Sequence, residues 1–491
     1  MNFRMLSRFT GYILLIEIAA MAPALGISIA NGEKDAVRGF VIAILLTAAA
    51  GVVCILPKPR VKKLYVAEGF AVTVISWLLM AFFGSLPFFF SGAIANPIDC
   101  FFESMSGFTT TGASILPEVE SLPKGILFWR CFTHWIGGMG VLVFLLALLP
   151  NSGGEGYSLH LLRAESPGPD VGKLTPKIRR SAMILYIIYV FLTIVQIIFL
   201  LCGGMSLFDS VCTAAATAGT GGFGIKNASI AGYSPYLQMV TAVFMTLFGI
   251  NFSIFYFVLI REFKAILYDE EFWLYLALVV FSTAVITLDI LPLYQSASGA
   301  FRDAFFQVSS LMSTTGFATT DFDRWPDFSR GLLLLLMMIG ASAGSTAGGF
   351  KVSRVLILVK SLRQEISRIL HPGAVRIVRL RGRPIEKNVQ KTVAVYTTAY
   401  LGITILSFIL VLLDNQGLFT SLSAVIACFN NVGPGFDLVG PTKNFSGFSG
   451  FNKMVLSLDM LMGRLEIFPI LALFSPSIWK KSLTNLREGE D

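Results

Sequence analysis

Charged residues are scarce in this sequence. Asp, Glu, Lys and Arg make up 14% of its 491 residues, whereas 55% are apolar, and soluble globular proteins carry about 25% charged residues. Histidine is scarcer still, and no HExxH or Ser/His/Asp arrangement can be assembled around His134, His160 and His371. The sequence therefore contains no recognisable catalytic motif built on histidine, and no enzymatic activity is predicted.

Close cysteine pairs and a nucleotide motif are also missing. The six cysteines stand singly in or beside apolar segments, at Cys54, Cys100, Cys131, Cys202, Cys212 and Cys428, so no redox motif or thiolate metal site is expected. No G-x-G-x-x-G follows a predicted strand, so we expect no cofactor in this chain. The net charge of +8 suits the basic cytoplasmic loops of a membrane protein better than nucleic-acid binding.

Long apolar runs dominate what is present. Several windows of eighteen or more residues carry almost no charge, and about 20 such residues cross the hydrocarbon core as a helix. An all-α integral membrane protein is therefore predicted. Its first two spans, Met1–Ala30 and Phe40–Leu56, are joined by Asn31–Arg38 and followed by the basic run Lys58–Lys63. The second span favours a helix pair over a cleaved signal peptide.

Four similar glycine phrases follow this pair. They read ESMSGFTTTGAS around Gly112, TAAATAGTGGFG around Gly222, VSSLMSTTGFAT around Gly316 and AVIACFNNVGPG around Gly433. Each phrase follows a short apolar piece that begins thirteen residues before the glycine, at Asp99, Asp209, Asp303 and Thr420. Because these residue types are good N-caps, the pattern predicts a cap, a short helix and a glycine turn in each case.

Each phrase lies between two long apolar helices, which predicts four repeats. The expected helices are Ala67–Ser91 and Leu122–Leu149, Arg180–Leu201 and Tyr236–Arg261, Phe272–Leu291 and Leu332–Leu362, and Val389–Leu413 and Lys453–Phe474. The chain then divides into a helix pair, 1–66, and four pore repeats, 67–150, 151–270, 271–388 and 389–491. The third repeat includes a candidate gating loop and the fourth a cytoplasmic tail.

The basic residues predict the orientation. Most of the 38 Lys and Arg fall on one side if both termini and the segments Pro57–Val66, Asn151–Ser181, Arg261–Glu271 and Lys351–Lys391 share it. That side should be cytoplasmic, with the glycine phrases facing outward. The short helices before them are too short to span, so they are expected to be re-entrant.

The glycine phrases suit a cation pathway. Bare backbone at membrane depth is tolerated where it is enclosed by protein or lines a watery cavity, and rings of carbonyl oxygens can replace the water shell of an ion. The C-terminal end of each short helix adds a partial negative charge. The alternative is that small residues merely allow close helix packing, but four aligned phrases favour a filter for a cation with weakly held water.

The phrases TTTGAS, TGGFG, STTGFATTD and NNVGPGF resemble the filter loops of the Trk/Ktr/HKT superfamily of potassium transporters, and the N-terminal helix pair is typical of its TrkH members. The resemblance implies potassium uptake across the bacterial inner membrane, with glycine instead of serine at Gly112 favouring potassium over sodium. Gly221 and Val432 replace a threonine, so the filter should be asymmetric and less strict. The implied potassium-binding residues are Thr110, Thr111, Gly112, Thr220, Gly221, Gly222, Thr314, Thr315, Gly316, Asn431, Val432 and Gly433.

A glycine-rich run, GASAGSTAGG from Gly340 to Gly349, interrupts the expected third-repeat helix. Each interior glycine costs a helix about 1 kcal/mol relative to alanine, so a continuous helix is poorly supported, although close helix packing is an alternative. The resemblance implies an intramembrane gating loop. Its implied residues are Gly340, Gly344, Gly348, Gly349 and Lys351.

Arg464 lies within the apolar run VLSLDMLMGRLEIFPILALF. A charge at mid-span costs at least about 2.5–3.5 kcal/mol, so it needs compensation. An ion pair with Glu466 or Asp459, or a helix-to-helix hydrogen bond, would supply it. The resemblance implies instead a positive barrier near the pore that interacts with the gating loop.

The resemblance also implies partners. TrkH proteins sit on a cytoplasmic TrkA ring that binds nucleotide, and they form homodimers within the lipid membrane. The basic segment Arg363–Lys391, which includes RIVRLRGRP, would face that ring, although a plain cytoplasmic loop has the same composition. A sodium or weakly selective pathway is one alternative function. A proton- or sodium-coupled symporter is another and predicts intramembrane carboxylates, whereas Asp289, Asp414 and Asp459 look near helix ends; a receptor or scaffold leaves the four glycines unexplained.

Overall fold

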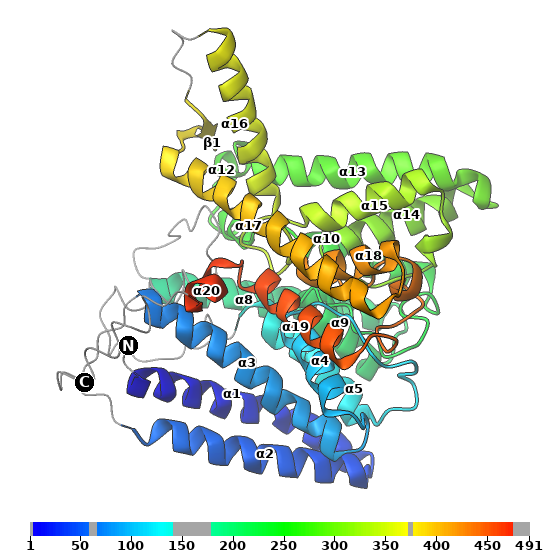
Figure 1. The fold of residues 1–491 in the computed structure, drawn as a ribbon. Coiled ribbons are helices and arrows are strands. Elements are labelled where there is room, and N and C mark those ends of the chain that lie inside the picture. The colour runs from blue at the N-terminus through cyan, green and yellow to red at the C-terminus, as the bar shows by residue number, and fades with distance from the viewer. Residues whose placement is uncertain (1–2, 58–65, 141–177, 372–376, 475–491) are drawn as a thin grey trace, which may run out of the picture.

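The computed structural model describes residues 3–57, 66–140, 178–371 and 377–474. Helices dominate these residues, and the first three, α1 (Phe3–Ala30), α2 (Lys34–Ile55) and α3 (Val66–Phe90), lie side by side (Figure 1). The remaining α-helices are α4 (Pro97–Phe108), α5 (Lys124–Gly138), α8 (Ile178–Cys202), α9 (Leu207–Ala218), α10 (Pro235–Phe248), α11 (Phe252–Leu259), α12 (Phe263–Leu267), α13 (Glu270–Ile290), α14 (Ala297–Met312), α15 (Asp327–Ile339), α16 (Val352–Leu370), α17 (Lys387–Val411), α18 (Leu418–Phe429), α19 (Gly450–Arg464) and α20 (Phe468–Leu473). A two-stranded hairpin, β1 (Arg379–Leu380) and β2 (Arg383–Pro384), joins α16 to α17.

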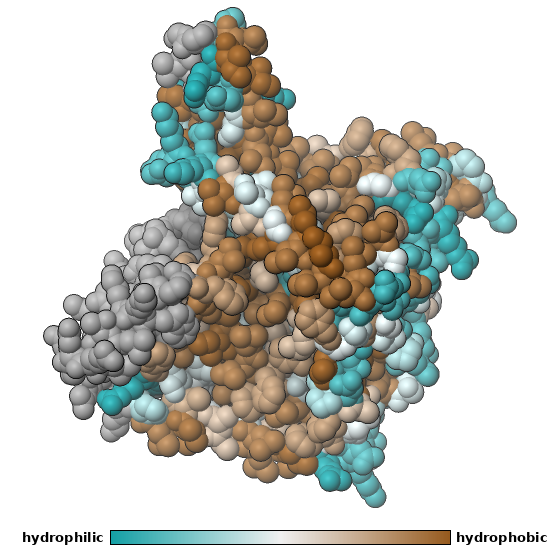
Figure 2. Space-filling view, in the orientation of Figure 1, coloured by the Kyte–Doolittle hydropathy of each residue, from teal (hydrophilic) through white to brown (hydrophobic). Residues whose placement is uncertain are grey.

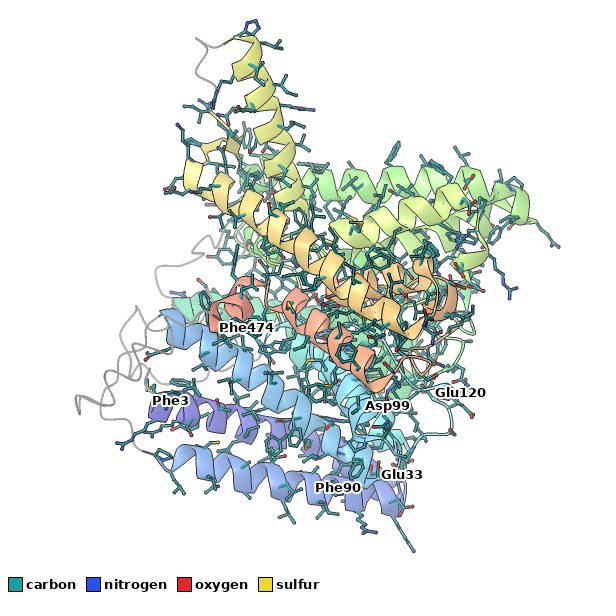
Figure 3. The ribbon with its side chains drawn as sticks, in the orientation of Figure 1. Phe3, Glu33, Phe90, Asp99, Glu120 and Phe474 are labelled. Atoms are coloured by element: carbon teal, nitrogen blue, oxygen red, sulfur yellow. The ribbon has the colours of Figure 1, made fainter. Side chains whose placement is uncertain are left out.

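The face of the molecule seen in Figure 2 is largely apolar. Figure 2 shows a broad brown face over the body, with teal residues gathered at one end and beside the projecting α16. Phe3 and Phe474 lie at one end of the molecule, and Glu33, Asp99 and Glu120 lie at the other (Figure 3). Within the described residues six helices, α1, α2, α3, α8, α13 and α17, are long and apolar enough to cross a membrane. The fold is therefore that of an all-α membrane protein.

The predicted first helices agree with the structure. The expected starts at Ala67, Arg180, Phe272 and Val389 correspond to α3, α8, α13 and α17 within two residues. In the N-terminal pair, α2 begins at Lys34, so the polar turn expected to reach Arg38 is shorter. The expected helix Leu122–Leu149 begins at Lys124 and is described as helix to Gly138. Its end, the basic run Lys58–Lys63, most of Asn151–Ser181 and the C-terminal tail lie outside the described residues.

Two helices that were predicted to be continuous are broken in the structure, so these predictions are wrong. The span predicted as Tyr236–Arg261 is broken between α10 and α11, which meet at 91°. Asn251 caps the second piece by accepting a hydrogen bond from Ser253 N at 2.9 Å. The span predicted as Lys453–Phe474 ends at Arg464 and resumes at Phe468, because Glu466 and Ile467 adopt positive φ angles of 58° and 66°. A β-branched residue at positive φ is rare and costs about 1–3 kcal/mol.

The short helices form a closed cycle of contacts. Each packs against the long helix that precedes it, so that α4 lies on α3, α9 on α8, α14 on α13 and α18 on α17. Three of them also pack against a helix from an earlier repeat, α9 on α5, α14 on α10 and α18 on α15. The cycle closes because α4 packs against α19 near the C-terminus. This arrangement brings the four glycine phrases, which follow these helices, to one place.

Candidate functional site

The four short helices begin three or more residues earlier than predicted. Asn96 and Ser206 are the N-caps of α4 and α9, and their side chains accept hydrogen bonds from Ile98 N and Asp209 N. The predicted caps are wrong for a physical reason, because acidic residues favour the first helical turn almost as much as the cap itself. Asp99, Asp209 and Thr420 are the third residues of α4, α9 and α18, and Asp303 lies two turns into α14.

The misassigned residues tether the short helices instead. Asp99 accepts from Lys453 Nζ at 2.7 Å, and Asp209 accepts from the Tyr233 hydroxyl at 2.9 Å. Thr420 donates to Asp437 at 2.6 Å. Each contact joins a short helix to a loop or a helix that follows it in the chain or in the cycle. The N-terminal turns of these short helices are therefore held by side chains from other parts of the chain.

Asp303 has two such donors. The Tyr294 hydroxyl donates to its Oδ2 at 2.9 Å, and Thr319 Oγ1 donates to its Oδ1 at 3.1 Å. Burial, followed by the Asp303 carboxylate, raises the pKa of Tyr294 to about 12, so this hydroxyl stays protonated and keeps donating. Because Thr319 follows the third glycine phrase, the carboxylate also holds the outgoing loop against α14.

The glycine phrases share one backbone conformation. In each, a non-glycine residue two positions before the glycine has a positive φ of 54–57°, and the glycine has a positive φ of 75–94°. The first set is Thr110, Thr220, Thr314 and Asn431, and the second is Gly112, Gly222, Gly316 and Gly433. Left-handed φ is rare for threonine, so its recurrence at three equivalent positions indicates a conformation imposed by the surroundings.

Each of the four glycines lies against a backbone carbonyl group of another glycine phrase. A Cβ added to Gly112 would overlap the carbonyl oxygen of Gly221, and one added to Gly222 would overlap that of Thr315. The same holds for Gly316 and the carbonyl of Val432, and Gly433 faces Thr111 O in the same way. Each loop therefore lies against the next, and the fourth lies against the first. The backbone closes into a ring in which glycine is required by space as well as by φ.

The residues between these positions are fully buried, including Thr111, Gly221, Thr315 and Val432. Hydroxyl pairs support the first and third loops, with Thr109 to Thr111 at 2.8 Å and Ser313 to Thr315 at 2.7 Å. Asn431 of the fourth loop donates to Thr111 Oγ1 at 3.0 Å and to Met460 O at 2.8 Å. Gly221 and Val432 carry no hydroxyl, so the side-chain support of the ring is unequal.

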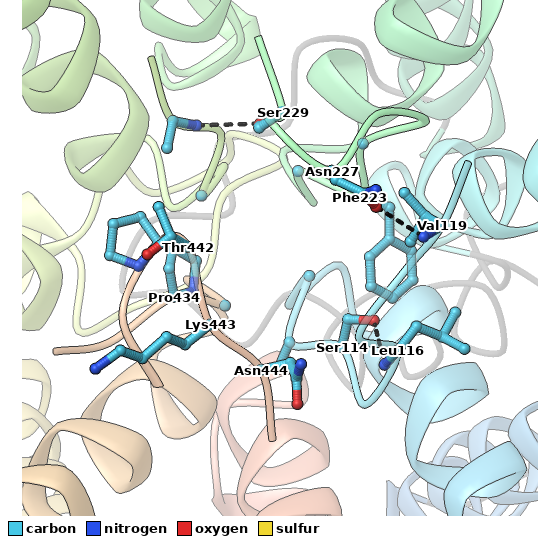
Figure 4. A pocket seen from close by; sticks show the side chains of 18 of the residues that line it. Ser114, Leu116, Val119, Phe223, Asn227, Ser229, Pro434, Thr442, Lys443 and Asn444 are labelled. Atoms are coloured by element: carbon cyan, nitrogen blue, oxygen red, sulfur yellow. Dashed lines mark hydrogen bonds between the residues drawn. The ribbon is translucent and has the colours of Figure 1, made fainter. Parts of the chain in front are cut away.

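A pocket opens over the ring and is lined by its four glycines (Figure 4). Its walls come from the loops that follow the glycines, where Val119 N donates to Asn227 Oδ1 at 2.8 Å and Ala318 N donates to Ser229 Oγ at 3.2 Å. No Asp or Glu of the described chain is among the residues that line it. Nor do three or more His, Cys, Asp or Glu of the described segments come together as metal ligands. The oxygen atoms at this place therefore belong to backbone carbonyls, hydroxyls and side-chain amides.

A buried ion pair that sequence reasoning missed supports the first two loops. Arg130 of α5 binds Glu103 of α4 at 2.7 Å, and both side chains are at most 1% exposed. Glu103 also accepts from Ile115 N at 3.0 Å, and Arg130 donates to Gly224 O at 3.2 Å. The pair thus connects the loop after Gly112 with the loop after Gly222. Its sequence signal was a single Glu and a single Arg within apolar stretches.

His134 has a similar role. Its Nδ1 lies 2.9 Å from Gly107 O, and its Nε2 accepts from Phe223 N at 3.3 Å. The carbonyl can only accept and the amide can only donate, so His134 is neutral with its proton on Nδ1. The imidazole therefore joins the short helix α4 to the second loop, which is a structural role that a lone histidine in the sequence did not indicate.

The glycine-rich segment, Gly340–Lys351, is not helical, as its composition predicted. It crosses below the ring and forms hydrogen bonds with backbone groups that the break between α10 and α11 leaves free. Ser342 N donates to Gly249 O at 3.1 Å, and Phe252 N donates to Gly344 O at 3.0 Å. Backbone groups freed at membrane depth need such partners. On the other side, Gly348 N donates to Thr314 Oγ1 at 2.8 Å. The segment therefore connects the break between α10 and α11 with the third loop of the ring.

The five candidate gating residues of this segment are not all at the ring. Gly348 lies against Asn431, whereas Gly344 lies against Asn251 and Gly340 against Gly349. Lys351 is buried, has a positive φ of 82° and donates to Ala347 O. Of these five residues, Gly348 is therefore the one that the structure places against the loops of the ring.

Arg464 joins the segment and the ring. It is the last residue of α19 rather than a mid-helix residue as predicted, because the helix breaks directly after it. Its guanidinium donates to Thr346 O and to Gly138 O, both at 2.7 Å, to Gly137 O, and more distantly to Thr110 Oγ1 at 3.4 Å.

The two carboxylates expected to pair with Arg464 are engaged elsewhere. Glu466 accepts from Arg354 of α16, whose guanidinium also lies 4.0 Å from the centre of the Tyr396 ring. Asp459 accepts from Ser407 Oγ at 2.7 Å. Carbonyl oxygens therefore provide the described compensation of the Arg464 charge. The Arg354–Glu466 pair fastens the α19–α20 break to the end of the glycine-rich segment.

Comparison with known proteins agrees with this geometry. A family model described as "TrkH: Cation transport protein" matches residues 33–481. The chain is 36% identical to the Trk system potassium uptake protein TrkH of Salmonella typhimurium and 32% identical to TrkG of Escherichia coli; both matches cover 98% of this chain and at least 99% of the relative. The crystal structure of the potassium transporter TrkH from Vibrio parahaemolyticus superposes with a TM-score of 0.86 at 33% identity, over 98% of this chain and all of that one. These relatives are named as transport proteins rather than enzymes, and the chain belongs to the TrkH family of cation transport proteins.

Proposed function

We propose that this chain carries potassium into the cytoplasm across a bacterial inner membrane, as the membrane subunit of a Trk-type uptake system. The single observation that carries the proposal is the closed ring of four loops, with glycine at Gly112, Gly222, Gly316 and Gly433. Backbone oxygens in such a ring can replace the water around a cation. The inside-negative potential drives entry by about 2.3 kcal/mol per 100 mV.

In this proposal the twelve ring residues are the potassium-binding filter. The first and third loops, with their hydroxyl pairs, are the stricter sides. Gly221 and Val432 make the second and fourth sides different, which favours potassium selectivity that is incomplete. A sodium or weakly selective pathway remains the candidate that this asymmetry supports.

The gate in this proposal is the glycine-rich segment together with Arg464. Gly348 contacts the ring from below, and Arg464 holds Thr346 there while placing a positive charge beside Thr110. A positive charge in a low-dielectric passage raises the barrier for a cation. Displacement of the segment would remove both obstacles.

The partner in this proposal is a cytoplasmic ring of the TrkA type that binds nucleotide, and the active form is a homodimer with both termini in the cytoplasm. The relatives' names refer to a Trk system. The basic residues between α16 and α17 are the surface that the partner would meet, since α16 projects from the body (Figure 1).

A second candidate is transport coupled to protons or sodium. Asp459, expected near a helix end, is buried inside α19, and Glu17 is buried inside α1 with no hydrogen-bond partner for its carboxylate oxygens among the described residues. Carboxylates at membrane depth are typical of coupled transporters. Potassium flux in liposomes with and without a proton gradient separates the two: a dependence on the gradient that Asp459→Asn removes would favour coupling.

The test of the main proposal is ion uptake in potassium-limited cells that lack other uptake systems. The native chain, with its partner supplied, should restore growth and potassium uptake, and Gly112→Ser should lower uptake and raise the share of sodium. A folded native chain that carries neither ion in the presence of the partner would refute the proposal.

A further inference from the structure

The hairpin between α16 and α17 lies on the start of α13. Its two-residue turn is formed by Arg381 and Gly382, with positive φ angles of 52° and 75°, as the tight turns of two-residue hairpins require. Leu380 and Val378 beside the turn are buried. The turn therefore presents the Arg381 side chain in a fixed direction. The hairpin itself lies beside α16 (Figure 1).

Three successive acidic residues receive basic side chains from this region. Arg381 lies 3.0 Å from Asp269 and 3.5 Å from Glu271. Between them, Glu270 pairs with Lys360 of α16, which also donates to Arg379 O of the hairpin at 2.8 Å. The Asp269 and Glu271 side chains are each 3% exposed, whereas Arg381 is 26% exposed. The hairpin thus supplies the cation that two buried carboxylates face.

The same Glu271 holds the glycine-rich segment. Its Oε1 accepts from Ala343 N at 2.6 Å, while its Oε2 faces Arg381. Ala343 lies directly before Gly344, which contacts the break between α10 and α11. One carboxylate therefore connects a cytoplasmic turn to the backbone of the segment below the ring.

We propose that Arg381 is a positioning residue for the glycine-rich segment: by holding Glu271 it fixes the amide of Ala343, and a force on the hairpin is transmitted to the segment through this side chain. This inference rests on the proposed function, in which the segment is the gate and a cytoplasmic partner acts on it. The hairpin leads into α17 and lies within the basic segment Arg363–Lys391, so a partner that moves the hairpin moves Arg381 with it.

The physical basis is charge balance. Without Arg381 the two buried carboxylates lose a nearby cation and repel each other at short range. Glu271 then turns away from Asp269 or takes up a proton, and either change weakens its bond to Ala343 N. A coupling of this kind between distant sites is typically worth about 5-fold to 150-fold in an equilibrium.

The test uses the full chain in liposomes, with a cysteine at Ser345 as a reporter of segment exposure. Ser345 is half-buried in the segment, and Cys54 and Cys202, which are not buried, are first replaced by serine. A charged methanethiosulfonate reagent is then added from the cytoplasmic side. Arg381→Gln is expected to speed labelling of the reporter by about fivefold or more, and Arg381→Lys is expected to give a smaller increase.

Arg379→Gln is the matched control, because it removes the same charge from the same hairpin and leaves the Arg379 carbonyl in place. The reporter cysteine in the Arg379→Gln protein should be labelled at the same rate as in the protein with the native hairpin. Glu271→Gln tests the link from the membrane side and should also speed labelling. Equal rates in Arg381→Gln, Glu271→Gln and Arg379→Gln would overturn the inference, and so would faster labelling in all three.

The labelling readout is independent of ion flux. Rubidium uptake is measured on the same liposomes, with and without the partner. If the native chain carries no ion but the contrast between Arg381→Gln and Arg379→Gln persists, the proposed function fails and the positioning role stands. If uptake is normal and the contrast is missing, only the positioning role fails.

Discussion

The ring of loops and the glycine-rich segment use glycine in different ways. In the ring, each of the four glycines lies against the carbonyl group of the next loop, so that a Cβ at any of them would collide with backbone. In the segment, Gly340, Gly348 and Gly349 would likewise place a Cβ within 3.0 Å of backbone atoms, whereas Gly344 would place one 3.2 Å from a side-chain atom of Asn251. Glycine is thus needed for close packing throughout the ring and at three positions of the segment, and mainly for its backbone angle at Gly344.

The ring and the glycine-rich segment also differ in the contacts that hold them in place. The ring is held by repeated contacts, such as the hydroxyl pairs of the first and third loops and the buried Glu103–Arg130 pair. The segment is held by hydrogen bonds to several separate elements. Ser342 and Gly344 bond the break between α10 and α11, Ala343 bonds Glu271, and Thr346 and Gly348 bond Arg464 and Thr314. A region held by buried ion pairs and close backbone packing resists local opening, whereas one held by hydrogen bonds to separate elements opens when those elements move apart.

The largest expected effect is on the supports of the ring. Arg130→Met leaves Glu103 buried without its cation, and the loss of one partner from a buried pair costs about 3–5 kcal/mol. The midpoint of thermal unfolding in detergent should fall accordingly. Arg324→Met is the control, since its pair with Asp321 leaves the arginine 86% exposed and such pairs contribute about 0–1 kcal/mol. Equal destabilisation by both changes would show that the buried pair does not support the ring.

The next effect is on the ring itself. Gly222→Ala introduces a Cβ that overlaps Thr315 O at a glycine with φ of 75°, so strain of about 1–3 kcal/mol combines with displacement of the neighbouring loop. Potassium uptake should fall by about 100-fold, the equivalent of about 2.7 kcal/mol. Gly331→Ala in α15 is the control, because a Cβ there meets nothing within 4 Å, and its uptake should be unchanged. Full uptake by Gly222→Ala would mean that the loops are not closely packed in the working protein.

A smaller effect is expected where the segment meets the ring. Arg464→Ala removes the donors to Thr346 and Gly138 together with a positive charge near Thr110. Because the segment then loses its hydrogen bond from Arg464, uptake measured without the partner should rise by about fivefold, the lower end of typical coupling energies. Arg368→Ala, on the exposed part of α16, should leave uptake unchanged. An unaltered flux in a folded Arg464→Ala protein would remove this residue from the gate.

Local features of the sequence were predictable. The apolar runs indicated the first helix of each expected repeat within two residues, because a membrane-spanning helix satisfies its own backbone. The four glycines were found by register, and the interruption at Gly340–Gly349 by composition. The caps at Asp99 and Asp209 were misplaced by three residues because Asp is favourable at both the cap and the first turn, and sequence alone does not distinguish the two positions. The cap predicted at Thr420 was also three residues too late, and the one predicted at Asp303 was seven residues too late.

Features that depend on distant partners were not predictable. The break after Phe248 exists because the glycine-rich segment, about a hundred residues away, satisfies the freed backbone groups. The partner of Glu103 and the link from Glu271 to Ala343 likewise join elements far apart in the chain. Arg464 was recognised as a charge that needs compensation, but its carbonyl partners could be identified only once the two helix breaks were known.

The smallest expected effect makes the sharpest comparison with the ring. Gly344→Ala also places a side chain at a positive φ, of 72°, but its nearest neighbours are side-chain atoms of Asn251 at 3.2–3.3 Å. The change therefore carries the strain of the backbone angle, about 1–2 kcal/mol, without a backbone collision. Uptake should change by less than about threefold, well below the loss expected for Gly222→Ala. If the two substitutions reduce uptake equally, the surroundings of Gly344 are packed as tightly as the ring, and a gate that opens at Gly344 is excluded.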